Sequence, residues 1–268
     1  MKKAKKVICW LAVLACAIAG GIVFFRSTYE TQEKTDVTAI KKAGVIKILT
    51  DPTFPPYEYV NNTGEIVGID IDIANLIAEK LVVRSEIITA DFPGLLPALA
   101  GGKGDMVIAA VSLTDQNKDV YPHSIPYANS CQRILVPAGC VGIGGLADLA
   151  GKKVGVPNGT TSSNFIDSKM HEEPFSDSPP TVVTYPSTTE LVQALLSGRI
   201  DAALLDSLPA ERAAEEDGIE VLPAMFGQEE YVFLYTKNAS QGLVSDIDNI
   251  ILEAEKNGTM DGFYKKHN

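Results

Sequence analysis

From residue 40 onward, short apolar runs alternate with segments in which apolar residues recur at helical spacing. Apolar runs bounded by turn residues predict buried strands, whereas apolar positions three and four residues apart predict amphipathic helices. The predicted strands cover residues 45–49, 87–88, 106–111, 132–136 and 231–235, and the predicted helices cover residues 71–81, 95–100 and 243–256. Because strands and helices alternate, the pattern indicates parallel sheets covered by helices, and we expect an α/β fold.

One stretch of this pattern occurs twice, about 96 positions apart. Residues 96–110 line up with residues 192–206, and each copy contains a short helix, a glycine turn, a basic residue, an aspartate and an apolar strand. The two aspartates are Asp105 and Asp201. Self-similarity of this kind predicts two similarly built α/β lobes.

The candidate functional residues follow the predicted strands. In open α/β sheets, ligands bind beyond the carboxyl ends of the strands, so a ligand of two facing lobes would lie between them. The closing strand and helix come after the second lobe is complete, and we expect them to return to the first. The segments that follow the strands are 51–57, 91–92, 109–117, 158–163 and Asp206.

Two of these segments carry polar groups suited to a ligand. Asp206 ends an apolar strand, where it either caps the next helix in solvent or directs a carboxylate at a ligand ammonium. Thr160 and Thr161 precede a predicted helix, where they either cap the helix or help its free N–H groups to bind an anion.

Three aromatic residues lie near prolines in the loops after the strands. An aromatic ring in such a loop either packs on its own lobe or presents a face to the ligand, including a cationic one. We expect Phe54 and Phe92 to face the ligand and Tyr57 to pack.

Charge excludes one large class of partner. The chain has 268 residues, with 23 basic and 34 acidic side chains. Five of the basic residues precede residue 28, where there is no acid, so the rest of the chain has 18 basic and 34 acidic residues. A body this acidic repels phosphate backbones and shows no basic stripe, so we expect no nucleic-acid partner.

The sequence contains no motif that demands catalysis. The three histidines lie far apart and form no HExxH pattern, and there is no Cys-x-x-Cys or G-x-S-x-G motif. Residues 145–153 resemble a phosphate-binding loop but have the wrong spacing. We therefore expect no metal, no cofactor and no catalytic residue.

The N-terminus is typical of an export signal, with a basic segment at residues 1–6 and an uncharged run at 7–25. Three versions remain open: cleavage after Ala19, lipidation at Cys16, or an uncleaved membrane anchor through residues 7–25. Each delivers the rest of the chain outside the cytoplasm, to the periplasm or the cell surface. A polar tether follows, and Cys131 and Cys140 are then either bridged or free.

Five segments in the expected order resemble the family 3 extracytoplasmic solute-binding proteins, the polar amino-acid receptors of ABC importers. These segments are residues 51–58 (DPTFPPYE), 68–74 (GIDIDIA), 91–99 (DFPGLLPAL), 149–156 (LAGKKVGV) and 258–266 (GTMDGFYKK). The resemblance implies a two-lobed fold with two crossing strands near residues 128–133 and 222–228. The implied domains are a signal or anchor at 1–27, a linker at 28–39, lobe 1 at 40–128 and 223–268, and lobe 2 at 129–222.

The resemblance also implies roles for individual residues. Phe54 and Phe92 match positions that stack on the ligand, Asp206 matches the position that holds the ligand's α-ammonium, and Ser112 and Thr161 match positions that hydrogen-bond the ligand. Asp51 matches a position that meets a basic side chain in some members. Together with Ala110, Asn117 and Thr160, these residues form the expected site.

Asn117 departs from the family pattern. Members that bind α-amino acids usually carry at this position an arginine that grips the α-carboxylate, and a guanidinium fork makes the stronger contact. Either the helix start at Thr160 and Thr161 binds the carboxylate, or the ligand lacks one.

The leading hypothesis is therefore a monomeric receptor that binds an amino acid or a related amine and delivers it to the membrane subunits of an ABC importer. Alternatives are an enzyme on the same fold, of the cyclohexadienyl dehydratase type with Asp206 as general acid, and a membrane-tethered sensory module.

Overall fold

The computed structural model describes residues 34–170, 172–173, 175 and 177–268. The predicted export signal, with its three versions, lies outside the described residues. Within the described part of the chain, no helix has the length and apolar character needed to cross a membrane. Residues 35–268 form one compact unit.

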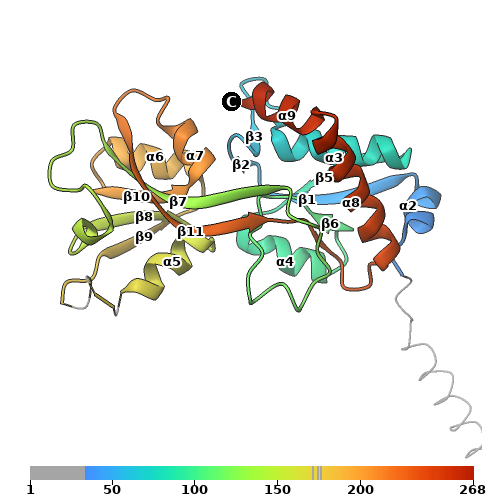
Figure 1. The fold of residues 1–268 in the computed structure, drawn as a ribbon, viewed down its shortest axis with the longest axis horizontal. Helices are drawn as coiled ribbons and strands as arrows, with labels where there is room; N and C mark the ends of the chain where they lie inside the picture. The colour runs from blue at the N-terminus through green and yellow to red at the C-terminus, as the bar shows by residue number, and fades with distance from the viewer. Residues whose placement is uncertain (1–33, 171, 174, 176) are drawn as a thin grey trace, which may run out of the picture. The chain divides into compact units, whose positions relative to one another are not determined.

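The first part of this unit, which we call lobe 1, is built on a sheet in the order β12-β6-β1-β5. β1 (Val45–Thr50) runs parallel to β5 (Arg84–Thr89) and β6 (Met106–Val107), and β12 (Leu234–Tyr235) is antiparallel to β6. The helices are α2 (Val37–Ala43), α3 (Ile69–Leu81), α4 (Phe92–Ala100), α8 (Gln241–Lys256) and α9 (Thr259–His267). Alternate side chains of β1 belong to two cores: Ile48 packs with residues of α3 and α8, whereas Leu49 packs with residues of α4. The ribbon in Figure 1 shows α3 and α4 on opposite sides of this sheet.

A small antiparallel sheet extends lobe 1 toward the site. It consists of β2 (Thr53–Phe54), β3 (Glu58–Val60) and β4 (Ile66–Val67). Gly68 follows β4 with a positive φ of 137°, and an added Cβ would lie 2.1 Å from the Tyr57 carbonyl oxygen. Only glycine allows this close approach, which fixes the start of α3 against β3.

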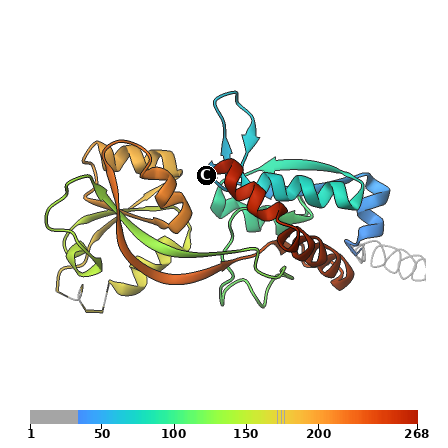
Figure 2. The ribbon, with the colours of Figure 1, turned by 45° about the horizontal axis from the view of Figure 1, so that its top comes forward.

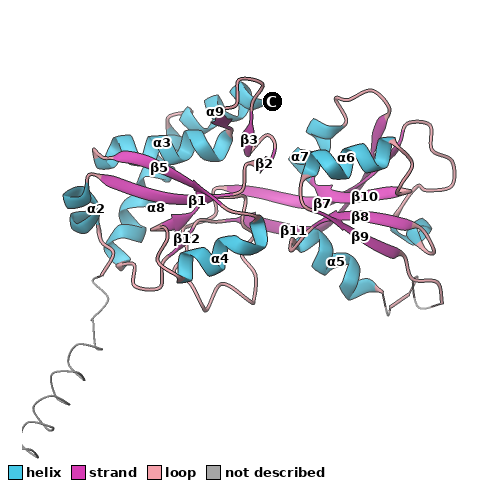
Figure 3. Cartoon of the chain, turned by 180° about the vertical axis from the view of Figure 1, so that it is seen from behind, coloured by secondary structure: helices cyan, strands magenta, loops and turns pink. Residues whose placement is uncertain are grey.

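The second part, which we call lobe 2, has a five-stranded sheet in the order β11-β7-β10-β8-β9. The strands are β7 (Ala128–Pro137), β8 (Lys153–Pro157), β9 (Thr181–Tyr185), β10 (Ala202–Asp206) and β11 (Ile219–Tyr231). The helical segments are η1 (Leu146–Leu149), α5 (Thr161–Lys169), α6 (Thr188–Leu196) and α7 (Ser207–Ala213). Apolar residues of α5 pack on one face of the sheet, and those of α6 and α7 pack on the other (Figure 3).

Two long antiparallel strands, β7 and β11, connect the lobes (Figure 2). They contain the predicted crossing segments at 128–133 and 222–228, so the two-lobed α/β fold with a two-strand hinge is confirmed. The register of the pair shifts between Val221 and Met225 and again between Phe226 and Glu229. At the second shift β11 carries one residue more than β7, which is a β-bulge.

The repeated sequence pattern has a structural cause. The Lys47 N–H donates to Asp105 Oδ2 at 2.8 Å, and the Lys153 N–H donates to Asp201 Oδ2, also at 2.8 Å. The backbone N–H of each aspartate donates back to the carbonyl of the same lysine. Each aspartate thus fixes the start of a buried strand against its neighbour, once in each lobe, and the predicted internal repeat is confirmed.

Several predicted bounds differ from the structure. The strand predicted at 106–111 ends at Val107, because Ala110 has a φ of 44°, which no β-strand contains. The strand predicted at 231–235 is divided between β11 and β12. The tether predicted up to residue 39 contains the start of α2, where Asp36 caps the helix by accepting a hydrogen bond from the Ala39 N–H.

Both cysteines in the described part of the chain are free. Cys131 is buried on β7, and Cys140 lies beyond the end of that strand. The sequence left open whether these two cysteines are bridged or free, and in the structure they are free thiols.

Candidate ligand-binding site

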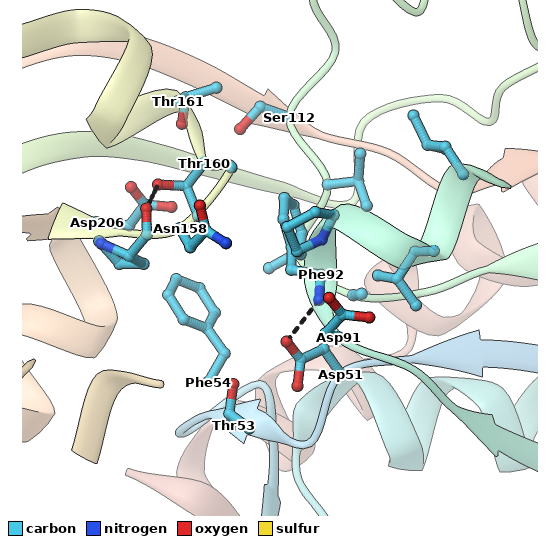
Figure 4. Close-up of a pocket in the computed structure, with 18 of the residues that line it drawn as sticks. Asp51, Thr53, Phe54, Asp91, Phe92, Ser112, Asn158, Thr160, Thr161 and Asp206 are labelled. Atoms are coloured by element: carbon cyan, nitrogen blue, oxygen red, sulfur yellow. Dashed lines mark hydrogen bonds between the residues drawn. The ribbon is translucent and has the colours of Figure 1, made fainter. Parts of the chain in front are cut away.

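A cavity of about 370 Å³ is lined by residues of both lobes. Its walls come from the carboxyl ends of β1, β8 and β10 and from the starts of α4, α5 and α6, as Figure 4 shows in part. We call this cavity the cleft. All nine residues predicted as ligand contacts line it, namely Asp51, Phe54, Phe92, Ala110, Ser112, Asn117, Thr160, Thr161 and Asp206.

Asp51 and Phe92 form one wall in lobe 1. The backbone N–H of Phe92, at the start of α4, donates to Asp51 Oδ2 at 2.9 Å (Figure 4). Burial raises the pKa of Asp51, although hydrogen bonds from Thr53 and Phe92 oppose the shift. The carboxylate is thereby fixed where β1 ends, at the start of α4.

Phe54 lies between the lobes. Its side chain is half-buried and packs against the core of α3 and β1 in lobe 1 and against the core of α6 and β10 in lobe 2. Tyr57 is buried in lobe 1, with its ring 5.3 Å from that of Tyr231 in an edge-on arrangement. The structure therefore confirms the packing role predicted for Tyr57 and places Phe54 in the cleft.

Asn117 uses its side chain to build its own loop. Its Nδ2 donates to the Ser112 carbonyl at 2.9 Å, and its Oδ1 accepts from the Thr114 N–H at 2.9 Å. Only 7% of the residue is exposed. Both ends of the amide bind its own loop, so Asn117 shapes the wall of the cleft.

Asp206 is buried at the end of β10, with 5% of its surface exposed. Gln132 Nε2 and the Tyr231 hydroxyl donate to its two carboxylate oxygens, and Ser162 Oγ lies 3.5 Å from Oδ1. Asp206 precedes α7 but makes no side-chain capping bond, which removes the alternative of a solvated helix cap. Burial, followed by the nearby charge of Glu229, raises the pKa of Asp206 to about 7.

Thr160 and Thr161 stand at the start of α5 without capping it. Thr160 Oγ1 donates to the Pro157 carbonyl at 2.9 Å, and Thr161 Oγ1 donates to Glu229 Oε2 at 2.8 Å. Neither side chain therefore caps α5, which removes the alternative of simple N-capping.

Two carboxylates near the cleft were not predicted from the sequence. Glu229, on β11, is half-buried and accepts hydrogen bonds from Ser112, Thr161 and Gln132. Glu58, on β3, lines the cleft and is 1% exposed, and its Oε2 has no partner. Burial and the neighbouring Asp70 raise the pKa of Glu58 well above its usual range. The segment 51–58 contained Glu58, but no pattern indicated its burial. The bulge that precedes Glu229 has one sequence signal, the glycine Gly227 inside the strand.

The cleft is acidic. Four carboxylate side chains line it, and none of its described lining residues is Lys, Arg or His. The four are Asp51, Glu58, Asp91 and Asp206. In the described part of the chain, no group of three His, Cys, Asp or Glu side chains is placed to hold a metal ion. The arrangement suits an organic cation that donates hydrogen bonds.

Comparisons with known proteins agree with this geometry. The family described as bacterial extracellular solute-binding proteins, family 3, matches residues 46–268. The L-cystine-binding protein TcyJ of Escherichia coli K12 is 27% identical over 96% of this chain and 93% of its own. The L-arginine-binding protein of Pseudomonas aeruginosa is 30% identical over 62% of each chain.

Solved structures with a similar fold include amino-acid-binding proteins. An ancestral arginine-binding protein bound to arginine has a TM-score of 0.76 and 35% identity, covering 84% of this chain and 98% of its own. The ancestral amino acid-binding protein AncCDT-1, a precursor of cyclohexadienyl dehydratase, has a TM-score of 0.80 and 29% identity, covering 87% and 99%.

Proposed function

Because the chain belongs to the bacterial extracellular solute-binding proteins of family 3, it is an exported receptor that serves an ABC importer, and we propose that Asp206 holds the amino group of its solute. The solute is an amino acid or a related small amine. The observation that carries this proposal is a buried carboxylate at the end of β10, in a cleft lined by acids and by no base among the described residues.

The remaining contacts follow from the walls of the cleft. Phe54 and Phe92 stack on the solute from lobe 1, and Asp51 accepts hydrogen bonds from its far end. Ser112, Thr160 and Thr161 supply hydroxyl groups, whereas Ala110 and Asn117 shape the wall. The lobes, which we assign to residues 40–128 with 223–268 and to residues 129–222, close by bending at β7 and β11 and exclude water.

The proposed function excludes chemistry on the solute, and its test is binding. A ligand at 100 times its dissociation constant stabilises the folded state by about 2.7 kcal/mol, which raises the melting temperature of a protein of this size by a few degrees. We expect such a shift when the purified protein, freed of carried-over ligand, is screened against amino acids, amines, short peptides and dicarboxylates. A flat screen across all of these classes would contradict the proposal.

One observation favours a second candidate function. Asp206 has a pKa of about 7 inside the cleft, which suits a general acid, and AncCDT-1 is a precursor of a dehydratase. Loss of prephenate or arogenate on incubation with the purified protein would establish this enzyme. The binding proteins named above favour the receptor.

The mode of attachment has a direct test. Cleavage after Ala19, lipidation at Cys16 and an uncleaved segment at 7–25 give three different masses for the mature protein. We propose a periplasmic or cell-surface location for all three, and monomers as the working form. Mass spectrometry of the exported protein, together with its sedimentation, tests both points.

A further inference from the structure

Glu229 joins the two lobes through a carboxylate. Its Oε2 accepts the Ser112 hydroxyl from the lobe 1 loop and the Thr161 hydroxyl at the start of α5 in lobe 2, the latter at 2.8 Å. Its Oε1 accepts Gln132 Nε2 at 2.8 Å. A carboxylate of this chain therefore already accepts hydrogen bonds from two hydroxyl groups that we expected to contact the ligand.

The bulge in β11 explains how Glu229 reaches this position. Phe226 pairs with Gln132 and Glu229 pairs with Ser130, so two residues of β11 stand opposite Cys131 alone. Gly227, with a φ of 50°, lies in this bulge. A bulge bends the strand and redirects the side chains that follow, and here the next side chain is that of Glu229.

The described walls contain no cationic side chain that would bind a ligand carboxylate. The Asn117 amide is occupied at both ends by its own loop. No described lining residue is Lys, Arg or His. A ligand carboxylate at the start of α5 would also lie near the half-buried carboxylate of Glu229, and like charges disfavour binding.

The cleft does contain carboxylate acceptors in both lobes. Asp206 lies in lobe 2, and Asp51 and Glu58 lie in lobe 1, with the rings of Phe54 and Phe92 also in the cleft wall. Glu58 Oε2 is buried and has no partner, and buried polar atoms in folded proteins are nearly always paired. A ligand with N–H donors at both ends would satisfy these acceptors.

We infer that the ligand is a small organic cation without a carboxylate, such as a diamine or a guanidino amine, and that Glu229 fills the place of the missing carboxylate. This inference rests on the proposed function and specifies its ligand class. One cationic end pairs with Asp206, the apolar chain lies against Phe54 and Phe92, and the other end meets Asp51 and Glu58.

The test compares each amino acid with its own decarboxylated amine. Calorimetric titration uses arginine with agmatine, lysine with cadaverine, and ornithine with putrescine, so that each pair differs only in the carboxylate. We expect at least one amine to bind about tenfold or more tightly than its amino acid, since a hydrogen bond to a charged group contributes at least that factor. Amino acids that bind as tightly as their amines would overturn the inference and leave the receptor function intact.

Preference for a dicarboxylate or a peptide over every amine would overturn the inference in the same way. A protein that binds none of the solute classes contradicts the proposed function itself. The two failures are therefore distinguishable.

A variant tests the role of Glu229 separately. Glu229→Gln removes the charge and keeps the size, so we expect the preference for an amine over its amino acid to fall about tenfold or more. Glu230→Gln, at the neighbouring exposed position of β11, should leave the preference unchanged. A preference that stays constant in Glu229→Gln, with the melting curve showing a folded protein, would contradict the assignment.

Discussion

Asp206 shows how a single buried carboxylate couples binding to pH. In the empty cleft its pKa is about 7, because burial and Glu229 disfavour the charged form. A cationic solute pairs with the ionised form, so below about pH 7 it must first displace the bound proton. Binding therefore strengthens as the pH rises through this range.

We expect the affinity for a cationic amine to be about tenfold lower at pH 6 than at pH 8, since each pH unit below the pKa costs a factor of ten. Titration calorimetry at the two pH values measures this. Asp206→Asn should bind more weakly at pH 8 and lose the pH dependence. Asp217→Asn, which alters an exposed acid, should keep the affinity at pH 8 and its dependence on pH. An affinity that does not vary with pH in the unmodified protein would contradict the role of Asp206.

Some residues of the cleft were predictable from the sequence, and others were not. The positions after the predicted strands contained Asp206, Phe54 and Phe92, because the carboxyl ends of strands meet in the cleft. Glu229 could not be found in this way, since its direction depends on a bulge and on partners in both lobes. A glutamate in a hinge strand has no local signature of such contacts.

At the scale of elements, the apolar pattern predicted the long helices, which bury one face, and the central strands, which bury both. The short strand β6 was predicted too long. Ala110 leaves the strand conformation, and its N–H donates to Asp70 Oδ2 at 2.8 Å. That bond joins the loop after β6 to the first turn of α3, a contact that local apolar runs do not encode.

Asp70 makes the stability of lobe 1 dependent on pH. It is fully buried, and burial raises its pKa to about 7 from an ordinary value of 3.8. Between these two pH values the folded state holds a proton that the unfolded chain has released. The free energy of unfolding therefore falls as the pH rises from about 4 to about 7.

Relative to Asp70→Asn, the unmodified protein should lose on the order of 3–4 kcal/mol of stability across this range, because a shift of one pKa unit corresponds to 1.36 kcal/mol. Urea denaturation of both proteins at pH 4.5 and at pH 8 measures the difference between their free energies of unfolding at each pH. Asp119→Asn, at an exposed position, should follow the unmodified protein. Parallel pH profiles for Asp70→Asn and the unmodified protein would show that Asp70 does not titrate in this range.

At the scale of the whole described unit, the lobes touch at the rim of the cleft. Gly159, after β8 in lobe 2, faces Pro93 of α4 in lobe 1, and an added Cβ would lie 2.8 Å from Pro93 Cγ. The two-lobed plan and the hinge were predictable from the repeated pattern and the resemblance. This contact was not, because it joins two loops from different lobes.

Gly159→Ala should oppose closure of the lobes. We expect its ligand affinity to fall about tenfold, because the closed form gains a contact that is too short for a Cβ atom. Gly198→Ala is a matched control: its φ of 68° is close to the 72° of Gly159, and an added Cβ there meets nothing within 4 Å. Both variants bear the same backbone strain, so a difference in ligand affinity between them, measured by titration calorimetry, reports the contact with Pro93. Equal affinities of the two variants would show that Pro93 and Gly159 do not meet in the bound form.

Carboxylates of both lobes line the cleft, Asp206 in lobe 2 and Asp51 in lobe 1. At alkaline pH, like charges repel across the empty cleft, whereas a bound cation cancels the repulsion and draws the same groups together. Opening and closing are then driven by the charge state of the cleft as well as by the hinge. Dissolved ions screen such forces over about 8 Å at physiological ionic strength. The degree of opening should therefore differ more between the empty and the ligand-bound protein at low salt than at high salt.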